Sequence, residues 1–251
     1  MPDKSLGQHW LKDRLVLEHI ADCADVNADD TVLEIGPGLG TLTSELLRRA
    51  KNVIAVEFDP NLAQKLPGQF PGKNLTVYSE DILKFDLSQL PAGYKVVANV
   101  PYYITSKIVQ KLMTAENKPA TTVLLVQKEV AVRIAAKPGD MSILAISAQV
   151  YATATLGDVV PAALFTPPPK VDSQVVILKT REAPLVSAGD EKAFFRVVKA
   201  GFSSKRKKLR SSLSGGLGIS KPEAENLLNS VKVSPDSRAE DLAIEDWLRL
   251  T

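Results

Sequence analysis

The stretch Leu33-Glu34-Ile35-Gly36-Pro37-Gly38-Leu39-Gly40-Thr41 decides the fold that we expect for this chain. It joins a short apolar run, typical of a strand, to an amphipathic run, typical of a helix. Glycines at such a junction let the backbone turn sharply and approach a ligand closely. The dinucleotide fingerprint G-x-G-x-x-G needs a third glycine where this chain has Thr41, which disfavours a nicotinamide enzyme. A tight turn with nothing bound is the plainer alternative for the loop taken alone.

Short β-branched runs alternate with amphipathic runs through the first 180 residues. We expect strands at Thr31–Ile35, Asn52–Glu57, Leu75–Tyr78, Lys95–Asn99, Thr121–Val126, Val150–Thr155 and Gln174–Lys179. We expect helices at Thr41–Ala50, Asn61–Leu66, Thr105–Met113 and Glu129–Ala136. This alternation predicts an α/β fold with a mostly parallel sheet covered on both faces. The last two strands have no comparable helix between them and are expected to pair antiparallel at one edge.

The flanking segments differ from this pattern. Before the first strand, Val16, Ile20 and Cys23 follow at i, i+4 and i+7, which predicts an N-terminal helix with Cys23 as a core thiol. After Thr180 the expected elements are all helical, at Glu191–Phe202, Lys205–Leu213, Lys221–Val231 and Ile244–Leu250. Pro184, Gly189, Gly215-Gly216 and Pro235 are read as the breaks between them. We therefore predict two domains, residues 1–180 and 181–251.

Charge is distributed unevenly along the chain. The formal net charge is only +2, from 31 Lys+Arg and 29 Asp+Glu. Between Lys192 and Arg210, however, there are eight basic residues and no acidic one. A concentrated basic block in a near-neutral chain indicates a local contact with a polyanion, and a solvated helix face is the plainer alternative.

Composition excludes several classes of protein. The single cysteine, Cys23, excludes an internal disulfide framework and a cysteine-rich zinc site, and it fits a reducing cytosol. Two histidines, His9 and His19, without an HExxH motif, leave no usual histidine metal cluster. The N-terminus lacks the apolar region of a secretory signal, and the uncharged segment Met141–Gly157 is too polar to span a membrane.

Two acidic residues at the ends of neighbouring strands point to a nucleoside. Glu57 ends the second strand, where a carboxylate can accept hydrogen bonds from ribose hydroxyls. Asp81 follows the third strand, where it can accept from an adenine amine. No Walker lysine follows the glycines, so we expect an adenosine without phosphates.

The fourth strand ends in Asn99-Val100-Pro101-Tyr102. The Asn99 amide oxygen and a carbonyl of the Val100-Pro101 segment can accept both protons of an aromatic amine, which favours the state with an available lone pair. Tyr102 offers a ring for base stacking. The triproline segment Phe165–Ser173 can hold Phe165 at a pocket edge, although for Phe165 taken alone a packed core is the favoured interpretation.

Several motifs together resemble the ribosomal RNA adenine dimethyltransferases. They are Lys4–Gln8, the Glu34–Gly40 loop, Asn99–Tyr102, Gln127–Val130 and Phe165–Ser173. Phe202–Leu213 and Arg238–Leu242 resemble the small-subunit (KsgA-type) branch of that family. The motifs occur in order over nearly the whole chain, so the resemblance is specific.

The resemblance implies a Rossmann-like class I S-adenosylmethionine-dependent methyltransferase fold, with a mostly parallel seven-stranded sheet and a small all-α C-terminal domain. It implies N6,N6-dimethylation of two adjacent adenosines in the 3′-terminal hairpin loop of small-subunit (16S) rRNA, within the pre-30S particle, as a contribution to small-subunit biogenesis. We expect a monomeric, cytoplasmic enzyme that uses S-adenosylmethionine and neither a metal nor a membrane.

The resemblance also assigns roles to residues of this chain. The expected donor-binding residues are His9, Leu11, Gly36, Gly38, Glu57, Asp81 and Asn99. Gly36 and Gly38 would face the methionine part of the donor, and the segment around His9 and Leu11 would close over it. The expected catalytic residues are Asn99 and Tyr102, which position the target amine, and Phe165, which stacks on the flipped base. The expected RNA-binding residues are Lys205, Arg206, Lys207, Lys208 and Arg210.

Two features depart from the family pattern. His9-Trp10 stands where the family usually has Asn-Phe, and the loop after Lys137-Pro138-Gly139 is shorter than usual.

Two alternative functions are a large-subunit rRNA methyltransferase of the antibiotic-resistance type and a non-catalytic RNA-binding assembly factor. Phe202–Leu213 and the three prolines at 167–169 argue against the first, and the intact Asn99–Tyr102 turn argues against the second.

Overall fold

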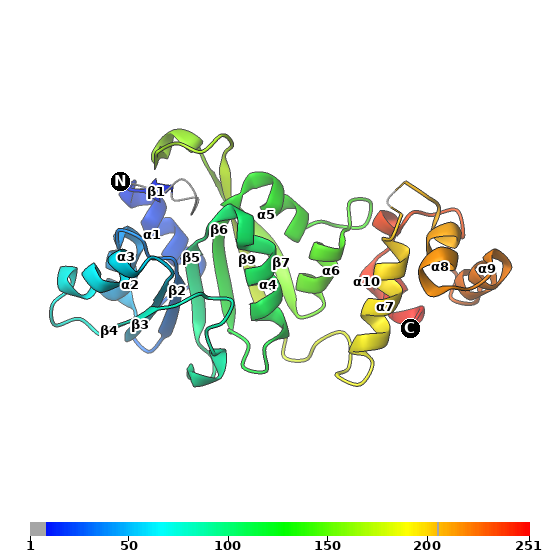
Figure 1. The fold of residues 1–251 in the computed structure, drawn as a ribbon, viewed down its shortest axis with the longest axis horizontal. Coiled ribbons are helices and arrows are strands. Elements are labelled where there is room, and N and C mark those ends of the chain that lie inside the picture. Colours follow the sequence, from blue (N-terminus) through cyan, green and yellow to red (C-terminus); the bar gives the residue numbers. More distant parts are fainter. Residues whose placement is uncertain (1–8, 205) are drawn as a thin grey trace. The chain divides into compact units, whose positions relative to one another are not determined.

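The computed structural model describes residues 9–204 and 206–251. The chain forms two compact units (Figure 1). Unit 1 comprises the chain up to Val132 together with Ala152–Arg181, and unit 2 comprises Arg133–Tyr151 and Glu182–Thr251. A domain border at residue 180 remains a prediction. The compact units differ from it at Arg133–Tyr151, which the prediction places in the first domain and which belongs to unit 2.

Unit 1 contains a seven-stranded sheet in the order β4-β3-β2-β5-β6-β9-β7. The strands are β2 (Thr31–Ile35), β3 (Asn52–Glu57), β4 (Leu75–Ser79), β5 (Lys95–Asn99), β6 (Thr121–Gln127), β7 (Ala152–Val160) and β9 (Ser173–Thr180). The five strands from β4 to β6 are parallel, and β9 pairs antiparallel with both β6 and β7. The predicted antiparallel pair at one edge is therefore confirmed, and so is the mostly parallel sheet.

Helices surround the sheet in unit 1 (Figure 1). They are α1 (Arg14–Cys23), α2 (Thr41–Arg49), α3 (Pro60–Lys65), α4 (Thr105–Thr114) and α5 (Lys128–Ile134), the last of which runs from unit 1 into unit 2. One apolar cluster joins Leu17 and Ile20 of α1 and Leu46 of α2 to alternate strand residues such as Val32 and Val97. Burial on both faces explains why these strands read as nearly continuous apolar runs.

A second, very small sheet pairs β1 (Trp10–Leu11) with β8 (Phe165–Thr166). Its antiparallel register sets Leu11 opposite Phe165 and Trp10 opposite Thr166. Segments more than 150 positions apart in the sequence thus lie side by side. The alternation of apolar and amphipathic runs does not reveal strands of two residues, so this pair was not predicted.

The N-terminal helix is confirmed, but Cys23 is only half-buried at its end. The Cys23 Sγ lies 3.6 Å from the His19 Nε2. Burial raises the pKa of the Cys23 thiol, with the Asp158 carboxylate as the next cause. Cys23 packs against the apolar core but is not fully buried in it, so the prediction of a core thiol is met only in part.

Unit 2 is helical. Its helices are α6 (Ile143–Gln149), α7 (Glu191–Gly201), α8 (Leu209–Leu217), α9 (Lys221–Ser230) and α10 (Ile244–Arg249). The helix predicted over Lys205–Leu213 begins only at Leu209, because Lys208 has an extended backbone and the Leu209 N–H donates to the Ser237 carbonyl at 2.8 Å. Arg206, Lys207 and Lys208 therefore lie in the turn before α8.

The Gly215-Gly216 pair lies inside α8 and does not break it. A Cβ atom at Gly216 would lie 2.5 Å from the Ala200 Cα, so glycine lets α8 pack closely against α7. Gly218, in the left-handed conformation, ends the helix instead. The sequence interpretation of the pair as a break is wrong for this reason.

No helix in the described part of the chain is long and apolar enough to span a membrane. Within residues 9–204 and 206–251, no three His, Cys, Asp or Glu side chains are grouped so as to hold a metal ion.

Candidate active site

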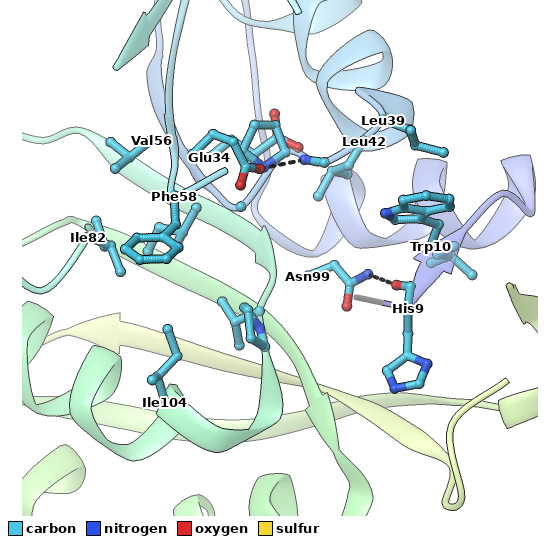
Figure 2. Close-up of a pocket in the computed structure, with 18 of the residues that line it drawn as sticks. His9, Trp10, Glu34, Leu39, Leu42, Val56, Phe58, Ile82, Asn99 and Ile104 are labelled. Atoms are coloured by element: carbon cyan, nitrogen blue, oxygen red, sulfur yellow. Dashed lines mark hydrogen bonds between the residues drawn. The ribbon is translucent and has the colours of Figure 1, made fainter. Parts of the chain in front are cut away.

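A cavity of about 230 Å³ opens at the carboxyl ends of β2, β3 and β5 in unit 1. It is lined by the glycine loop, by the residues that follow β3 and β4, by the Asn99–Ile104 turn and by the N-terminal strand β1. Figure 2 shows side chains from all of these segments around one space. Ligands of open α/β sheets bind at this edge, so the cavity is the candidate active site.

The glycine loop forms one wall of this cavity. Gly36, Gly38 and Gly40 all have positive φ, of 66°, 56° and 80°, which favours glycine at each of them. A Cβ atom at Gly40 would lie 2.8 Å from the Leu66 Cδ1, so this glycine also permits the packing of α2. The Thr41 hydroxyl, at the position where the dinucleotide fingerprint needs glycine, donates to the Leu11 carbonyl at 2.9 Å and joins the loop to β1.

Glu57 lies beneath the loop and is only 6% exposed. Its Oε2 accepts from the Gly38 N–H at 3.0 Å, and its Oε1 accepts from the Asp59 N–H at 2.9 Å. Burial raises the pKa of Glu57, although these backbone donors oppose the shift. Each carboxylate oxygen keeps a further lone pair that a hydroxyl in the cavity can use.

Glu34 is the residue of this wall to which the sequence interpretation gave no role. It is 1% exposed, it lines the cavity, and its Oε2 has no hydrogen-bond partner. Burial raises the pKa of Glu34 to about 8, with the nearby Glu57 carboxylate acting in the same direction. A charged residue within the otherwise apolar run of β2 was the available signal. A cation in the cavity would favour the ionised form of this carboxyl, because a nearby opposite charge lowers the pKa of a carboxyl group.

Asp81 follows β4 and lines the cavity as predicted. Its Oδ1 accepts from the Leu83 N–H at 2.9 Å, which orients the carboxylate. Ile82 and Phe58, both labelled in Figure 2, add apolar surface to the cavity wall. An acceptor beside apolar side chains suits a flat, polar-edged ring such as a nucleobase.

Asn99 is the last residue of β5, and its side chain lines the cavity. Its Nδ2 donates to the His9 carbonyl at 3.2 Å, as the dashed line in Figure 2 shows. This bond fixes the amide so that Oδ1 is left as an acceptor. The Pro101 carbonyl accepts from the Ile104 N–H and the Thr105 hydroxyl, at 3.3 and 3.4 Å. The second acceptor that the sequence predicts would therefore be the Val100 carbonyl.

Tyr102 and His9 form a fixed aromatic pair at the cavity. Their ring centroids lie 5.8 Å apart with 19° between the planes. The Tyr102 hydroxyl shares a hydrogen bond of 2.7 Å with the Ser173 hydroxyl, and the His9 Nδ1 donates to the Pro167 carbonyl at 2.7 Å. Burial raises the pKa of Tyr102, so its phenol stays neutral. His9 thus joins the N-terminal segment to the triproline segment.

Phe165 is not at the cavity. It is 3% exposed, belongs to the apolar core, and pairs with Leu11 through the β1–β8 register. In this structure Phe165 would have to leave the core to stack on a base, and its stacking role stays a prediction. Leu11 itself both lines the cavity and packs in the core, at 1% exposed.

The predicted RNA-binding residues lie in unit 2. Lys205 is outside the described residues, and Arg206, Lys207 and Lys208 are exposed in the turn before α8. The Lys208 Nζ lies 3.0 Å from the Asp236 carboxylate. The Arg210 guanidinium lies 3.1 Å from Glu225 and 3.3 Å from Asp236. Part of the predicted basic block is thus paired with acidic side chains.

Comparison with known proteins agrees with this geometry. The sequence profile described as "Ribosomal RNA adenine dimethylase" matches residues 2–251. The chain belongs to this family. A curated relative, "Ribosomal RNA small subunit methyltransferase A" of Dehalococcoides mccartyi (strain CBDB1), is 45% identical over 98% of this chain and 86% of its own. The resemblance predicted from the motifs is confirmed.

Two solved structures of rRNA adenine dimethylase relatives share the fold over nearly the whole chain. A dimethyladenosine transferase from Plasmodium falciparum has a TM-score of 0.83 and 30% identity, and 96% of each chain is covered. The 23S rRNA methyltransferase ErmE has a TM-score of 0.79 and 30% identity, with 96% of this chain and 97% of that chain covered. The predicted Rossmann-like methyltransferase fold is therefore confirmed, and this rRNA adenine dimethylase is an enzyme of the methyltransferase class.

Proposed function

We propose that this protein transfers methyl groups from S-adenosylmethionine to N6 of adenosines in small-subunit rRNA, and that it dimethylates two adjacent adenosines in the 3′-terminal hairpin loop. The observation that carries the proposal is the Asn99 side chain. Its amide is fixed by the His9 carbonyl, and its free Oδ1 faces the cavity of a member of the adenine dimethylase family.

The residues around the cavity fit S-adenosylmethionine. Glu57 and Asp81 offer acceptors for ribose hydroxyls and an adenine amine, and the glycine loop leaves room beside them. The Glu34 Oε2 has no hydrogen-bond partner, and a cationic group of the ligand would stabilise the ionised form of this carboxyl. When bound, S-adenosylmethionine supplies an electrophilic methyl group on a sulfonium. Leu11, Gly36, Gly38 and His9 would enclose its methionine part.

The chain's own residues would prepare the amine for attack. The N6 lone pair of adenine is delocalised into the ring, so the nitrogen becomes nucleophilic only as it turns pyramidal. The Asn99 Oδ1 and the Val100 carbonyl would accept the two amine protons in that geometry. The Tyr102 ring, held by its bond to Ser173, would support the base after it leaves its stack. Catalysis would then depend mainly on positioning and not on a dedicated general base.

Further parts of the proposal concern the setting of the reaction. We propose a monomer that acts in the cytoplasm on rRNA within the pre-30S particle, with Arg206, Lys207, Lys208, Arg210 and Lys205 near the RNA. Curated relatives at 40–45% identity carry the name "Ribosomal RNA small subunit methyltransferase A", and this supports small-subunit rRNA as the substrate. Similarity to ErmE supports large-subunit rRNA as a second candidate.

The test is methyl transfer from radiolabelled S-adenosylmethionine to isolated ribosomal subunits that lack the modification. We expect label in small subunits only, at two adjacent dimethylated adenosines on mass mapping. Label in large subunits instead would establish the second candidate. No label in either subunit, together with no donor binding by calorimetry, would leave a non-catalytic RNA-binding factor.

A further inference from the structure

Helix α7 carries three basic side chains on one exposed face. Lys192, Arg196 and Lys199 follow at i, i+4 and i+7, so they form a single stripe along the helix. All three are exposed, while the opposite face of α7, which includes Phe194 and Val198, is buried. Seven residues advance a helix by about 10 Å, so the stripe is long enough for more than one anionic group.

The stripe differs in its electrostatics from the turn before α8. Lys192, Arg196 and Lys199 form no ion pair with any residue in 9–204 or 206–251. Lys208 and Arg210, by contrast, are paired with Asp236 and Glu225. Three unpaired cations on one helix face repel one another, and an external polyanion would relieve that repulsion.

The stripe also borders a groove. A cavity of about 760 Å³ is lined by the three basic residues, by the half-buried ring of Phe195 and by Gly216 of α8. Since α8 approaches α7 closely at Gly216, no side chain from α8 fills the groove at that point. Glu191 is the acidic residue at the groove, and its carboxylate accepts a hydrogen bond from the Tyr151 hydroxyl.

We propose that the groove along Lys192, Arg196 and Lys199 binds the phosphate backbone of the rRNA substrate. The identity of the polyanion rests on the proposed function, whereas the cationic groove is a feature of unit 2 itself. The Arg196 guanidinium can hold a phosphate by two parallel hydrogen bonds, and the two lysines act as point charges on either side. Such contacts fix the position of the RNA without reading its bases.

The experiment compares two triple variants of the full chain. Lys192→Gln/Arg196→Gln/Lys199→Gln removes the stripe, and Lys137→Gln/Lys221→Gln/Lys232→Gln removes the same charge from exposed positions elsewhere in unit 2. Binding of a fluorescently labelled RNA hairpin is measured by anisotropy at several salt concentrations. Each phosphate contact contributes about 0.7–0.9 to the slope of log K against log salt, so we expect the stripe variant to lose about 2–3 from that slope. The control variant should retain most of it.

The outcomes separate this proposal from the proposed function. Equal slopes for the stripe variant and wild type would overturn the groove as an RNA site, and so would an equal loss in the control variant. If the triple variant fails to fold, Arg196→Gln alone should lower the slope by about 0.7–0.9, while Arg196→Lys preserves it. Failure of wild type to methylate small subunits would overturn the proposed function only, because the slopes require no methyl transfer.

Discussion

Replacing Glu34 by glutamine should remove a pH dependence from the stability of unit 1. Glu34 is buried in β2, and burial raises the pKa of its carboxyl from 4.5 to about 8. The folded state therefore holds a proton that the unfolded state has already lost. The resulting stabilisation is complete below pH 4.5 and is lost as the pH rises through about 8. Between pH 6 and pH 9, these two pKa values correspond to a loss of about 3 kcal/mol in the free energy of unfolding.

Urea unfolding at pH 6 and pH 9 measures this loss. Unit 1 contains the seven-stranded sheet, so native-state hydrogen exchange of the β2 and β5 amides in urea reports the unfolding of unit 1. The parent protein should lose about 3 kcal/mol more than the Glu34→Gln variant between pH 6 and pH 9. Glu57 is also buried with a raised pKa, but it is present in both proteins and cancels from the difference.

Glu80→Gln is the matched control, because Glu80 lines the same cavity while remaining partly exposed. It should leave the pH dependence close to that of the parent protein. If Glu34→Gln showed the same loss of stability as its parent between pH 6 and pH 9, the carboxyl would not be protonated in the fold.

Three further predictions concern the cavity and its loop. Asn99→Ala should reduce methyl transfer by at least tenfold while donor affinity in calorimetry changes little, since the lost acceptor acts on the target amine; unchanged turnover would exclude that role. Glu57→Ala should weaken donor binding by about tenfold or more, because a ribose acceptor and the Gly38 support are lost together, and an unaltered dissociation constant would contradict it. Gly40→Ala should destabilise unit 1 by about 2–5 kcal/mol. About 1–2 kcal/mol would come from placing alanine in the left-handed conformation, and about 1–3 kcal/mol from overpacking of its Cβ against Leu66. Gly72 has a similar φ, and a Cβ atom there would have no neighbour within 4 Å, so Gly72→Ala should show only the backbone strain in urea unfolding. Equal losses of stability in the two variants would refute the overpacking at Gly40.

The regular part of the fold was predictable because its signals are local. Every strand of the large sheet matches an expected run to within a few residues at each end, except that β7 extends to Val160. The site residues Glu57, Asp81 and Asn99 could also be located, because strand ends in a parallel sheet meet at one edge. Residue type and position at a strand end were sufficient to place these three side chains at the cavity.

Local sequence patterns were least informative where a contact distant in sequence decides the structure. Phe165 is in the core because it pairs with Leu11, and no local pattern indicates such a pair. Gly216 is helical because Ala200 lies against it, although two glycines in succession favour a break. The unpaired Oε2 of Glu34 depends on what surrounds β2 in three dimensions, so the sequence could mark the residue as unusual but could not describe its state.

The pairing of β1 with β8 has a consequence for how molecules enter the cavity. β1 lines one side of the cavity, and its pairing with β8 and single hydrogen bonds from the Thr41 and Asn99 side chains to the Leu11 and His9 carbonyls hold it there. The His9 ring adds one further hydrogen bond, to the Pro167 carbonyl. So small a unit can open locally at a free energy well below that of unfolding the seven-stranded sheet. A ligand can therefore enter or leave the cavity while the core of unit 1 stays folded. Sequence changes in the N-terminal segment can retune residence times in the cavity while the sheet that carries Glu57 and Asn99 stays intact.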